Sequence, residues 1–213
     1  MDGDSKSTSH GISVRRGQPI SLRQNSLVTR GLEDIAQLDK TRAEQLFKRA
    51  NAFYDNGDYD KAIADFTEAI RLDPKYAVAY FNRACDYRSK GEFDRTIADY
   101  TDAIRLDPKD ARAYNNRGSA YGKKGELDKA IVDYTEAIRL DPKDAVAYYD
   151  RGLAYAEKGE FDRAIADYTD AIRLDPRDAL AYYCRGVAYK KKGEKSKAEA
   201  DFTEAKRLGF KPQ

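Results

Sequence analysis

The sequence has few of the residues that build metal centres, disulfides and catalytic bases. It contains one histidine, His10, two cysteines, Cys85 and Cys184, and no tryptophan. A single histidine in a polar leader supplies neither a base among other catalytic groups nor a metal cluster. Two cysteines do not indicate a disulfide-built domain, so we expect free thiols and a cytoplasmic protein.

Long apolar runs and an excess of one charge are missing too. No run approaches the roughly 20 apolar residues of a membrane-spanning helix, and the N-terminal segment has arginines but no apolar block, so we expect no secretory signal. The 39 basic and 37 acidic residues leave a net charge of +2. A dedicated nucleic-acid binder carries a strong basic excess or stripe. We therefore expect neither a membrane nor a nucleic acid as a partner.

Most of the chain consists of one repeated unit. The segment AIRLDP begins at Ala69, Ala103, Ala137 and Ala171, with a constant spacing of 34 residues. The third and fourth units are identical at 23 of 34 positions. Self-similarity at this period indicates a repeat architecture. Cutting the chain at this spacing gives five repeats: 43–76, 77–110, 111–144, 145–178 and 179–212.

Each unit is predicted to form two helices joined by a short turn. In the third unit Tyr114, Gly118 and Tyr121 follow one face of a first helix. Gly125 then suits a left-handed helix end. Small residues recur at the place of Gly118 and would let neighbouring helices approach closely: Ala84, Gly118, Gly152 and Gly186.

The second helix of the unit has its own start and stop signals. Asp128 is expected to cap its beginning. Pro142 ends it, because proline disfavours helical geometry at the preceding residue and lacks an amide donor. Asp144 is then expected to cap the first helix of the next unit. A single helix pair leaves half of its apolar surface exposed, so stacking of identical pairs is how such a chain folds.

These units resemble the tetratricopeptide repeat. The resemblance covers residues 43–212, with Thr96 in place of an alanine and Phe210 in place of a proline. It implies an all-α fold, a right-handed superhelical solenoid of five helix-turn-helix (TPR) repeats. The fourth unit shows the family order of bulky, small, aromatic, Ala, aromatic, Ala and Pro residues at Tyr148, Gly152, Tyr155, Ala164, Tyr168, Ala171 and Pro176.

The fifth unit differs from the others on its second helix. It has Glu199 and Lys206 at places where the first four units have isoleucine. A terminal repeat needs a polar outer face, because no further repeat covers it. We therefore expect the array to end with the fifth unit.

Every unit also carries an arginine and an aspartate sixteen residues apart. One interpretation is a basic ladder for an anionic ligand. The other, which the uniformity of the pairs favours, is an interhelical ion pair that was duplicated with the unit. The pairs are Arg49/Asp65, Arg83/Asp99, Arg117/Asp133, Arg151/Asp167 and Arg185/Asp201.

No group of residues stands out as a catalytic site. The sequence has no glycine-rich phosphate loop, and its recurrent carboxylates lie at helix starts and stops, where capping explains them. We predict a non-enzymatic protein with no cofactor and no metal.

Function is therefore expected on a surface. On each first helix a second stripe of side chains is turned away from the packing stripe, because a helix advances about 100° per residue. In the tetratricopeptide family this stripe lines a concave groove that holds extended peptides or helices. The resemblance implies these peptide-binding residues: Phe47, Asn51, Tyr54, Phe81, Asn82, Arg88, Arg112, Asn115, Asn116, Tyr149, Leu153, Tyr183 and Val187.

The predicted groove has two parts. The amides of its middle part, with Arg88 and Arg112, suit the backbone and carboxylate groups of a peptide. The last two repeats, with Tyr149 and Tyr183, suit an apolar side-chain anchor or an amphipathic helix. The alternative is a surface inherited by duplication that binds nothing.

Some family members bind the acidic C-terminus of heat-shock chaperones through a clamp of Lys, Asn, Asn, Lys and Arg. The corresponding residues here are Phe47, Asn51, Asn82, Arg112 and Asn116. Phe47 and Asn116 each remove a cation from this clamp, so chaperone binding is a minor expectation.

The N-terminal 42 residues lie outside the repeats. Residues 1–24 are polar and serine-rich and are predicted to be disordered. Residues 25–42 are predicted to form a short helix or cap, with Val28, Leu32 and Ile35 on one face. We favour a cap on the first repeat. The alternative is that this segment docks into the groove of its own chain or of a neighbour.

We predict a scaffold or adaptor that binds a peptide segment of a partner protein in the concave groove. A self-assembling, homo-oligomeric module is the first alternative. A nucleic-acid accessory protein is the weakest, because the charges are mixed.

Overall fold

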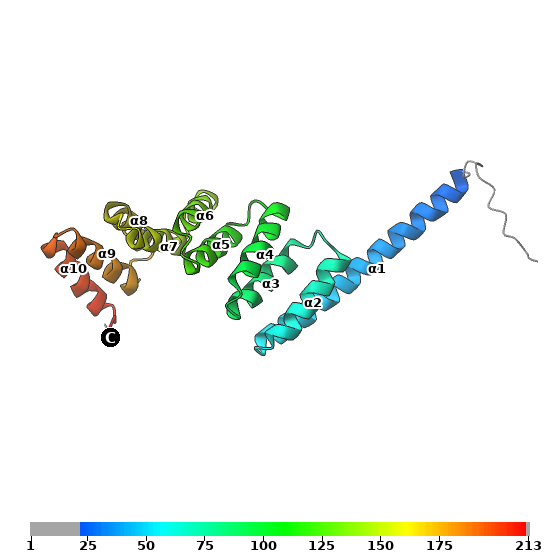
Figure 1. The fold of residues 1–213 in the computed structure, drawn as a ribbon, viewed down its shortest axis with the longest axis horizontal. Helices are drawn as coiled ribbons and strands as arrows, with labels where there is room; N and C mark the ends of the chain where they lie inside the picture. Colours follow the sequence, from blue (N-terminus) through cyan, green and yellow to red (C-terminus); the bar gives the residue numbers. More distant parts are fainter. Residues whose placement is uncertain (1–21, 212–213) are drawn as a thin grey trace, which may run out of the picture. The chain divides into compact units, whose positions relative to one another are not determined.

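The computed structural model describes residues 22–211, and their side chains from Thr29 onward. All regular structure in this part of the chain is α-helical (Figure 1). Contacts divide the chain into two units, residues 1–39 and residues 40–213. The helices are α1 (Leu22–Asp55), α2 (Tyr59–Leu72), α3 (Ala77–Ser89), α4 (Phe93–Leu106), α5 (Ala111–Lys123), α6 (Leu127–Leu140), α7 (Ala145–Glu157), α8 (Phe161–Leu174), α9 (Ala179–Lys191) and α10 (Lys195–Arg207).

The described part of the first unit is the beginning of α1. Leu32, Ile35 and Leu38 are 63, 57 and 69% exposed there. α1 continues through Gly31 to Asp55, so the segment predicted as a short separate helix, 25–42, lies within one longer helix. Most of the predicted disordered leader, residues 1–21, lies outside the described residues.

The second unit contains five helix pairs, as predicted from the 34-residue period. α3 packs on α4, α5 on α6, α7 on α8 and α9 on α10, and each second helix also packs on the first helix of the next pair. The last part of α1 forms the first pair with α2, through Arg49 with Asp65 and Phe47 with Phe66. The first helices α3, α5, α7 and α9 are thus each held between two second helices, which leaves one side of each uncovered.

The turns confirm most of the local predictions. Gly125 has φ +75°, and Gly57, Gly91, Gly159 and Gly193 have the same left-handed geometry at the equivalent turns. The carboxylate of Asp144 caps α7 by accepting a hydrogen bond from the Val146 amide at 2.9 Å.

The prediction that Asp128 caps the second helix is wrong. α6 begins at Leu127, one residue earlier, and Glu126 precedes it without a side-chain capping bond. Asp128 lies in the first turn of α6, where it accepts a hydrogen bond from Lys158 Nζ of the next repeat at 2.5 Å. A carboxylate in the first turn still favours the helix electrostatically. Asp128 thus stabilises α6 without capping it, and its hydrogen bond is made to the next repeat.

The core is built from small residues against one ring in each repeat. A Cβ placed on Gly152 would lie 2.8 Å from Cε1 of Tyr168, and Gly118 and Gly186 face Tyr134 and Phe202 in the same way. Glycine is therefore needed at these three places for the helices to approach as closely as they do. This confirms the prediction from the recurrent small residues.

Two sets of polar contacts join neighbouring repeats. Arg117 donates two hydrogen bonds to Asp133 of its own repeat and one to Thr101 of the preceding repeat. The ion-pair interpretation of the arginine–aspartate spacing is thus confirmed. The second set pairs a lysine with an aspartate of the preceding repeat: Lys90 with Asp60, Lys124 with Asp94, Lys158 with Asp128 and Lys192 with Asp162.

The residues of this lysine–aspartate ladder are absent at the two ends of the array. The first repeat has Asn56 where the others have the lysine, and the fifth has Ser196 where the others have the aspartate. Glu199 and Lys206 are exposed on α10, as a terminal helix requires.

Candidate functional site

The third and fourth repeats, which are both interior units, differ mainly along one face of their first helices. Between the third and fourth repeats, the five differences outside the first helix are conservative, such as Lys129 against Arg163. Of the six within it, five change chemical character, as in Asn115 against Tyr149. We call the varying positions the first-helix face. They are represented in the third and fourth repeats by Arg112, Asn115, Asn116, Ser119, Gly122 and Lys123 and by Val146, Tyr149, Asp150, Leu153, Ala156 and Glu157.

The first-helix face is continuous from repeat to repeat. Asn82 Nδ2 on α3 donates a hydrogen bond to Asn51 Oδ1 on α1 at 2.8 Å. Arg88 Nη1 on α3 donates to Asn116 Oδ1 on α5 at 3.0 Å. Further along, the Tyr149 hydroxyl on α7 lies 3.6 Å from the Cys184 sulfur on α9. The predicted residues that take part in these contacts are therefore brought together along one surface.

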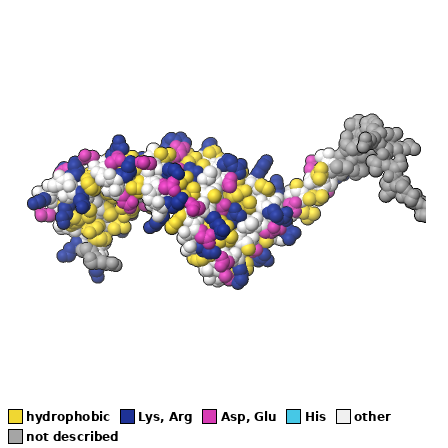
Figure 2. Space-filling model, in the orientation of Figure 1, with side chains coloured by type: hydrophobic (Ala, Val, Ile, Leu, Met, Phe, Trp, Pro, Cys, Tyr) yellow, Lys and Arg dark blue, Asp and Glu magenta, His cyan; other side chains and the backbone are white. Residues whose placement is uncertain are grey.

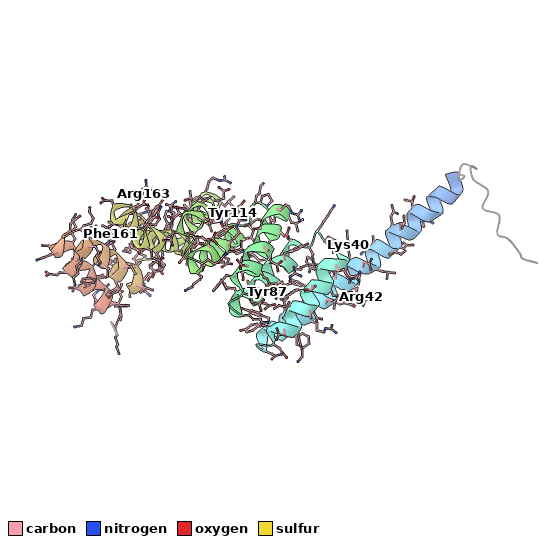
Figure 3. The ribbon with its side chains drawn as sticks, viewed as in Figure 1. Lys40, Arg42, Tyr87, Tyr114, Phe161 and Arg163 are labelled. Carbon is pink, nitrogen blue, oxygen red and sulfur yellow. The ribbon has the colours of Figure 1, made fainter. Side chains whose placement is uncertain are left out.

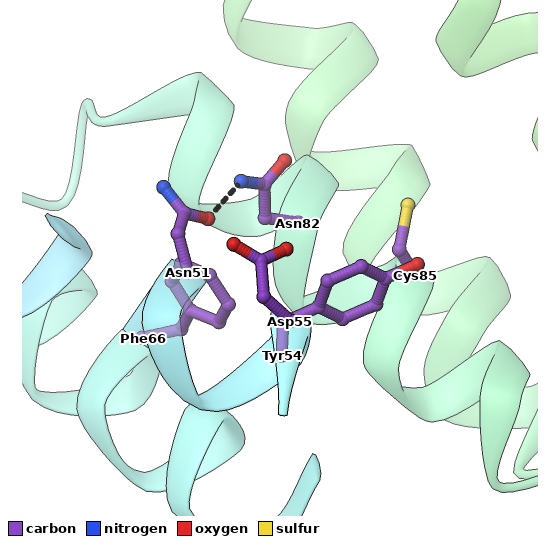
Figure 4. Close-up of a pocket in the computed structure, with 6 residues that line it drawn as sticks. All are labelled: Asn51, Tyr54, Asp55, Phe66, Asn82 and Cys85. Atoms are coloured by element: carbon purple, nitrogen blue, oxygen red, sulfur yellow. Dashed lines mark hydrogen bonds between the residues drawn. The ribbon is translucent and has the colours of Figure 1, made fainter. Parts of the chain in front are cut away.

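At the N-terminal end of the face a cavity of about 220 Å³ opens between the first two repeats (Figure 4). The amide pair of Asn51 and Asn82 lines it, and Figure 4 shows the Asp55 carboxylate directed to the same space. Its other lining residues are Tyr54, Phe66 and Cys85. Burial raises the pKa of the Cys85 thiol, whose sulfur lies 3.2 Å from the Tyr100 hydroxyl.

The two arginines of the face already have contacts within the chain. Arg112 donates to both carboxylate oxygens of Asp110, and its guanidinium lies 5.3 Å from the centre of the Phe81 ring. Arg88 is held by Asn116. Both arginines are exposed. A ligand carboxylate would therefore have to compete with Asp110 for Arg112.

A second cavity, of about 210 Å³, lies between the third and fourth repeats and has more charged residues in its lining. Asp150 and Glu157 line it together with Ser119, Lys123 and Tyr134. Burial raises the pKa of Asp150 to about 6.

The Asn115 amide nitrogen reaches Asp150 at 3.5 Å, which is long for a hydrogen bond. The side-chain oxygen of Asn115 is buried without a described partner. The two side chains therefore satisfy each other only weakly.

The aromatic residues predicted as anchors are partly built into the fold. The ring of Tyr149 packs beside Tyr168, with centroids 5.8 Å apart. Tyr183 is stacked on Phe210 at 4.3 Å and lies 5.5 Å from Phe202. Phe210, which replaces the family proline, thus covers Tyr183. Leu153 and Val187 are half-buried.

At the other end of the face, Phe47 packs between Phe66 and Tyr76, with centroid distances of 5.6 and 5.0 Å. Phe81 meets Tyr100 edge-on at 5.4 Å. These rings form the floor of the face. The side chains above them are more exposed: Tyr54, Arg88 and Arg112. Because they are exposed, these three can exchange a contact within the chain for one with a ligand at the least cost in free energy.

One buried residue next to the face was missed by sequence reasoning. Asp86 is completely buried, and both of its carboxylate oxygens lack a hydrogen-bond partner among the described residues. Burial raises its pKa to about 7. The signal was present in the sequence, because the other four repeats have alanine at this place: Ala52, Ala120, Ala154 and Ala188.

Other kinds of site find no support in the residues 22–211. No group of three or more His, Cys, Asp or Glu side chains in this part of the chain is arranged to hold a metal ion. None of its helices is long and apolar enough to cross a membrane. Basic and acidic side chains are intermingled on the face shown in Figure 2. Some basic side chains are held against aromatic rings. Arg163 lies near Phe161 at the start of α8 (Figure 3), and its guanidinium is 5.4 Å from the centre of the Tyr155 ring.

A linear array of helix pairs with one variable face defines a helical-repeat protein. Sequence models of the TPR repeat match residues 50–84, 86–125 and 152–193. Tetratricopeptide repeat models match residues 111–144, 133–166 and 179–208. The chain belongs to the tetratricopeptide repeat family.

Solved structures with the same architecture include several bacterial proteins. A crystal structure of MamA is 31% identical, with 75% of this chain and 93% of that chain covered and a TM-score of 0.73. YrrB, whose structure is titled "a TPR protein with an unusual peptide-binding site", is 23% identical over 77% of this chain and 84% of its own, with a TM-score of 0.69.

Pseudomonas aeruginosa pilF is 18% identical over 82% of this chain and 79% of its own, with a TM-score of 0.71. YrrB and pilF show the likeness of fold alone. No curated protein sequence matches the chain.

Proposed function

We propose that the protein is a non-enzymatic scaffold that binds an extended peptide segment of a partner protein along the first-helix face. Tetratricopeptide repeats are protein-interaction modules, and this family membership supports the general class. The observation that carries the proposal is the distribution of differences between the third and fourth repeats. The framework residues are repeated nearly unchanged, while Asn115 and Asn116 become Tyr149 and Asp150 one repeat later.

This distribution is expected of a surface that reads a ligand. Substitutions on a face without a function would be neutral and would resemble those elsewhere on the exterior, which here are conservative exchanges such as Glu136 for Asp170. A peptide that lies across several repeats meets a different group at each step. Amides at the N-terminal end and apolar groups at the C-terminal end would then fix its direction.

The amides provide the contacts that an extended backbone needs. In the Asn51–Asn82 pair, one amide nitrogen and one amide oxygen are used between the two side chains. The Asn51 nitrogen and the Asn82 oxygen remain to pair with a peptide carbonyl and a peptide N–H. A chaperone-type carboxylate clamp is less suited to this face, because Phe47 packs in the core and Arg112 is bound by Asp110.

The test is selection of random 12-residue peptides on the full-length protein, followed by binding measurements on the variant Asn51→Ala with Asn82→Ala. The selected peptides should bind the wild type and lose at least tenfold in affinity for the double variant, while circular dichroism is unchanged. The matched control is Glu68→Ala with Asp102→Ala on the second helices, whose side chains pair with an arginine of the same helix, and which should bind normally. Absence of any selected peptide, or equal binding to all three proteins, would overturn the proposal.

A second candidate function is self-assembly. It is favoured by the row of exposed apolar side chains at Leu32, Ile35 and Leu38 on α1, since large exposed apolar side chains in a row often mark interaction surfaces. Light scattering of the full chain should then show a mass that rises with concentration. The variant Leu32→Glu with Leu38→Glu should remain monomeric at all concentrations. A monomeric wild type would exclude this candidate.

A further inference from the structure

The cavity between the first two repeats combines carboxylates, amides and an aromatic ring. We infer that it receives a basic side chain, lysine or arginine, of the bound peptide, with Asp86 as the buried counter-charge and Asp55 at the opening. This inference rests on the proposed function and names the chemistry that one of its subsites recognises. It concerns a cation, whereas the chaperone-type clamp of the family recognises carboxylates.

Asp86 is a neighbour along α3 of two residues that line this cavity. On α3 it follows Cys85 directly and stands one turn beyond Asn82, and both of those residues line the cavity. The corresponding cavity of the third and fourth repeats gives an independent placement. Its lining residues Tyr134, Asp150 and Leu153 correspond to Phe66, Asn82 and Cys85, each displaced by 68 residues.

With the same displacement Asp86 corresponds to Ala154, and Ala154 lines that second cavity. This position of the first helix thus faces the cavity between the third and fourth repeats. In the second repeat the position holds a carboxylate in place of a methyl group.

The carboxylate is unsatisfied where it lies. Both oxygens of Asp86 are buried without a hydrogen-bond partner, and neither Asp86 nor Asp55 forms an ion pair with a described residue. A buried carboxylate without a partner is unfavourable, and a cation brought next to it removes most of that cost. The residue is therefore poised to gain a partner, in contrast to Asp65 and Asp99, which are already held by arginines.

The rest of the cavity suits an organic cation. The Tyr54 ring is partly exposed at its wall and offers a face for a cation–π contact. The volume of about 220 Å³ accommodates the end of a lysine or arginine side chain. A metal ion is not the occupant we infer, because no described group of His, Cys, Asp and Glu has the arrangement that a metal requires.

The amide pair completes the subsite. Asn51 and Asn82 lie on the same cavity and can hold the peptide backbone next to the basic residue. Asp86 is completely buried, so the basic side chain can reach it only if exposed side chains at the opening, such as Tyr54 or Asp55, move aside.

The experiment uses the peptides selected on the full-length protein at pH 7.5. Those that depend on Asn51 and Asn82 should share a lysine or arginine at one position. Replacing that residue with the uncharged norleucine should lower the affinity for the wild type at least tenfold, since removal of one partner of a buried charge pair has an effect of this size or more. On Asp86→Ala the same replacement should change the affinity less than twofold.

Asp86→Ala should fold, because alanine occupies this place in the four other repeats; circular dichroism checks this. Asp102→Ala on the second helix serves as the charge-matched control and should behave as the wild type. If the groove-dependent peptides share no basic residue, or if norleucine costs the same on wild type and Asp86→Ala, the inference is overturned while the proposed function stands. If no peptide is selected at all, both fail.

Discussion

The guanidinium of Arg117 and the carboxylate of Asp133 form a two-point ion pair across the helices of the third repeat, with nitrogen–oxygen distances of 2.7 and 2.8 Å. The same guanidinium reaches back to Thr101 in the second repeat. One side chain thus fixes the geometry inside a repeat and the junction to its neighbour. Its hydrogen bonds to Asp133 raise the pKa of Arg117, so the guanidinium stays charged.

Substitution of Arg117 by alanine should destabilise the array strongly. The side chains of Arg117 and Asp133 are only 16 and 5% exposed, and removal of one partner leaves a buried charge, at a cost of about 3 kcal/mol. Arg49→Ala is the matched control, because the same pair in the first repeat has an arginine that is 61% exposed, and its loss should cost about 1 kcal/mol or less. Urea unfolding of the two variants measures the difference, and equal losses would contradict this account.

Asp86 should make stability depend on pH. Its pKa is raised from 3.8 to about 7 in the folded chain, because burial disfavours the charged form. A carboxyl group whose pKa is higher in the folded than in the unfolded chain does not lower the free energy of unfolding at a pH below its unfolded pKa. The reduction in stability grows as the pH rises toward 7 and is constant above it.

Asp86→Ala should therefore stabilise the protein by about 2 to 4 kcal/mol at pH 8 and by much less at pH 4. Urea unfolding across this pH range measures the effect. Asp55→Asn, at the opening of the same cavity, is the control and should leave the pH slope in place. A wild type whose stability does not fall between pH 4 and pH 7 would show that the carboxyl group has a partner in solution.

Gly152→Ala should destabilise the fourth repeat, although alanine is the better helix former. The new Cβ would lie 2.8 Å from Cε1 and 3.0 Å from Cδ1 of Tyr168, and such overpacking costs about 1 to 3 kcal/mol, part of which the helix propensity of alanine offsets. Gly122→Ala is the control on α5, since its nearest neighbour would be the Tyr134 hydroxyl oxygen at 3.9 Å. That variant should be more stable than the wild type by about 0.5 to 1 kcal/mol. The melting temperature should be lower than that of the wild type for Gly152→Ala and higher for Gly122→Ala.

Phe210→Ala should loosen the C-terminal repeat. The Phe210 ring stacks on Tyr183 at 4.3 Å, and loss of an aromatic pair together with its buried area costs about 1 to 2 kcal/mol. Amide hydrogen exchange should accelerate in α9 and α10 and remain unchanged in α3 and α4. Lys211→Ala, at the next residue, should have no such effect. If amide exchange in α9 and α10 is as slow in Phe210→Ala as in Lys211→Ala, the ring does not hold the end of the array.

Much of the fold could be predicted because the decisive signals are local and periodic. Gly125 must adopt a left-handed conformation and Asp144 must cap the next helix whatever surrounds them. The spacing of Arg117 and Asp133 recurs in every repeat, which indicated a framework contact. Asp128 was wrongly predicted as a cap, because the sequence shows a suitable residue and does not show that a lysine of the next repeat binds it.

The candidate site was predictable in position and less so in accessibility. The helical period places Asn51 and Asn82 on the uncovered side of the first helices. It does not show that Tyr183 is stacked on Phe210, because that contact depends on how the chain turns after α10. Asp86 could have been found by comparing the five repeats, since the equivalent residues are alanines, but its lack of partners is a property of the packed structure.

The unmatched residues at the ends of the lysine–aspartate ladder determine how this protein can be lengthened. A copy of an interior unit joined before the first repeat would present its aspartate to Asn56, and one joined after the fifth would present its lysine to Ser196. A unit inserted between the third and fourth repeats would find its partner on both sides. Engineers who want a longer groove should therefore splice in the middle of the chain, and leave both outermost modules as they are.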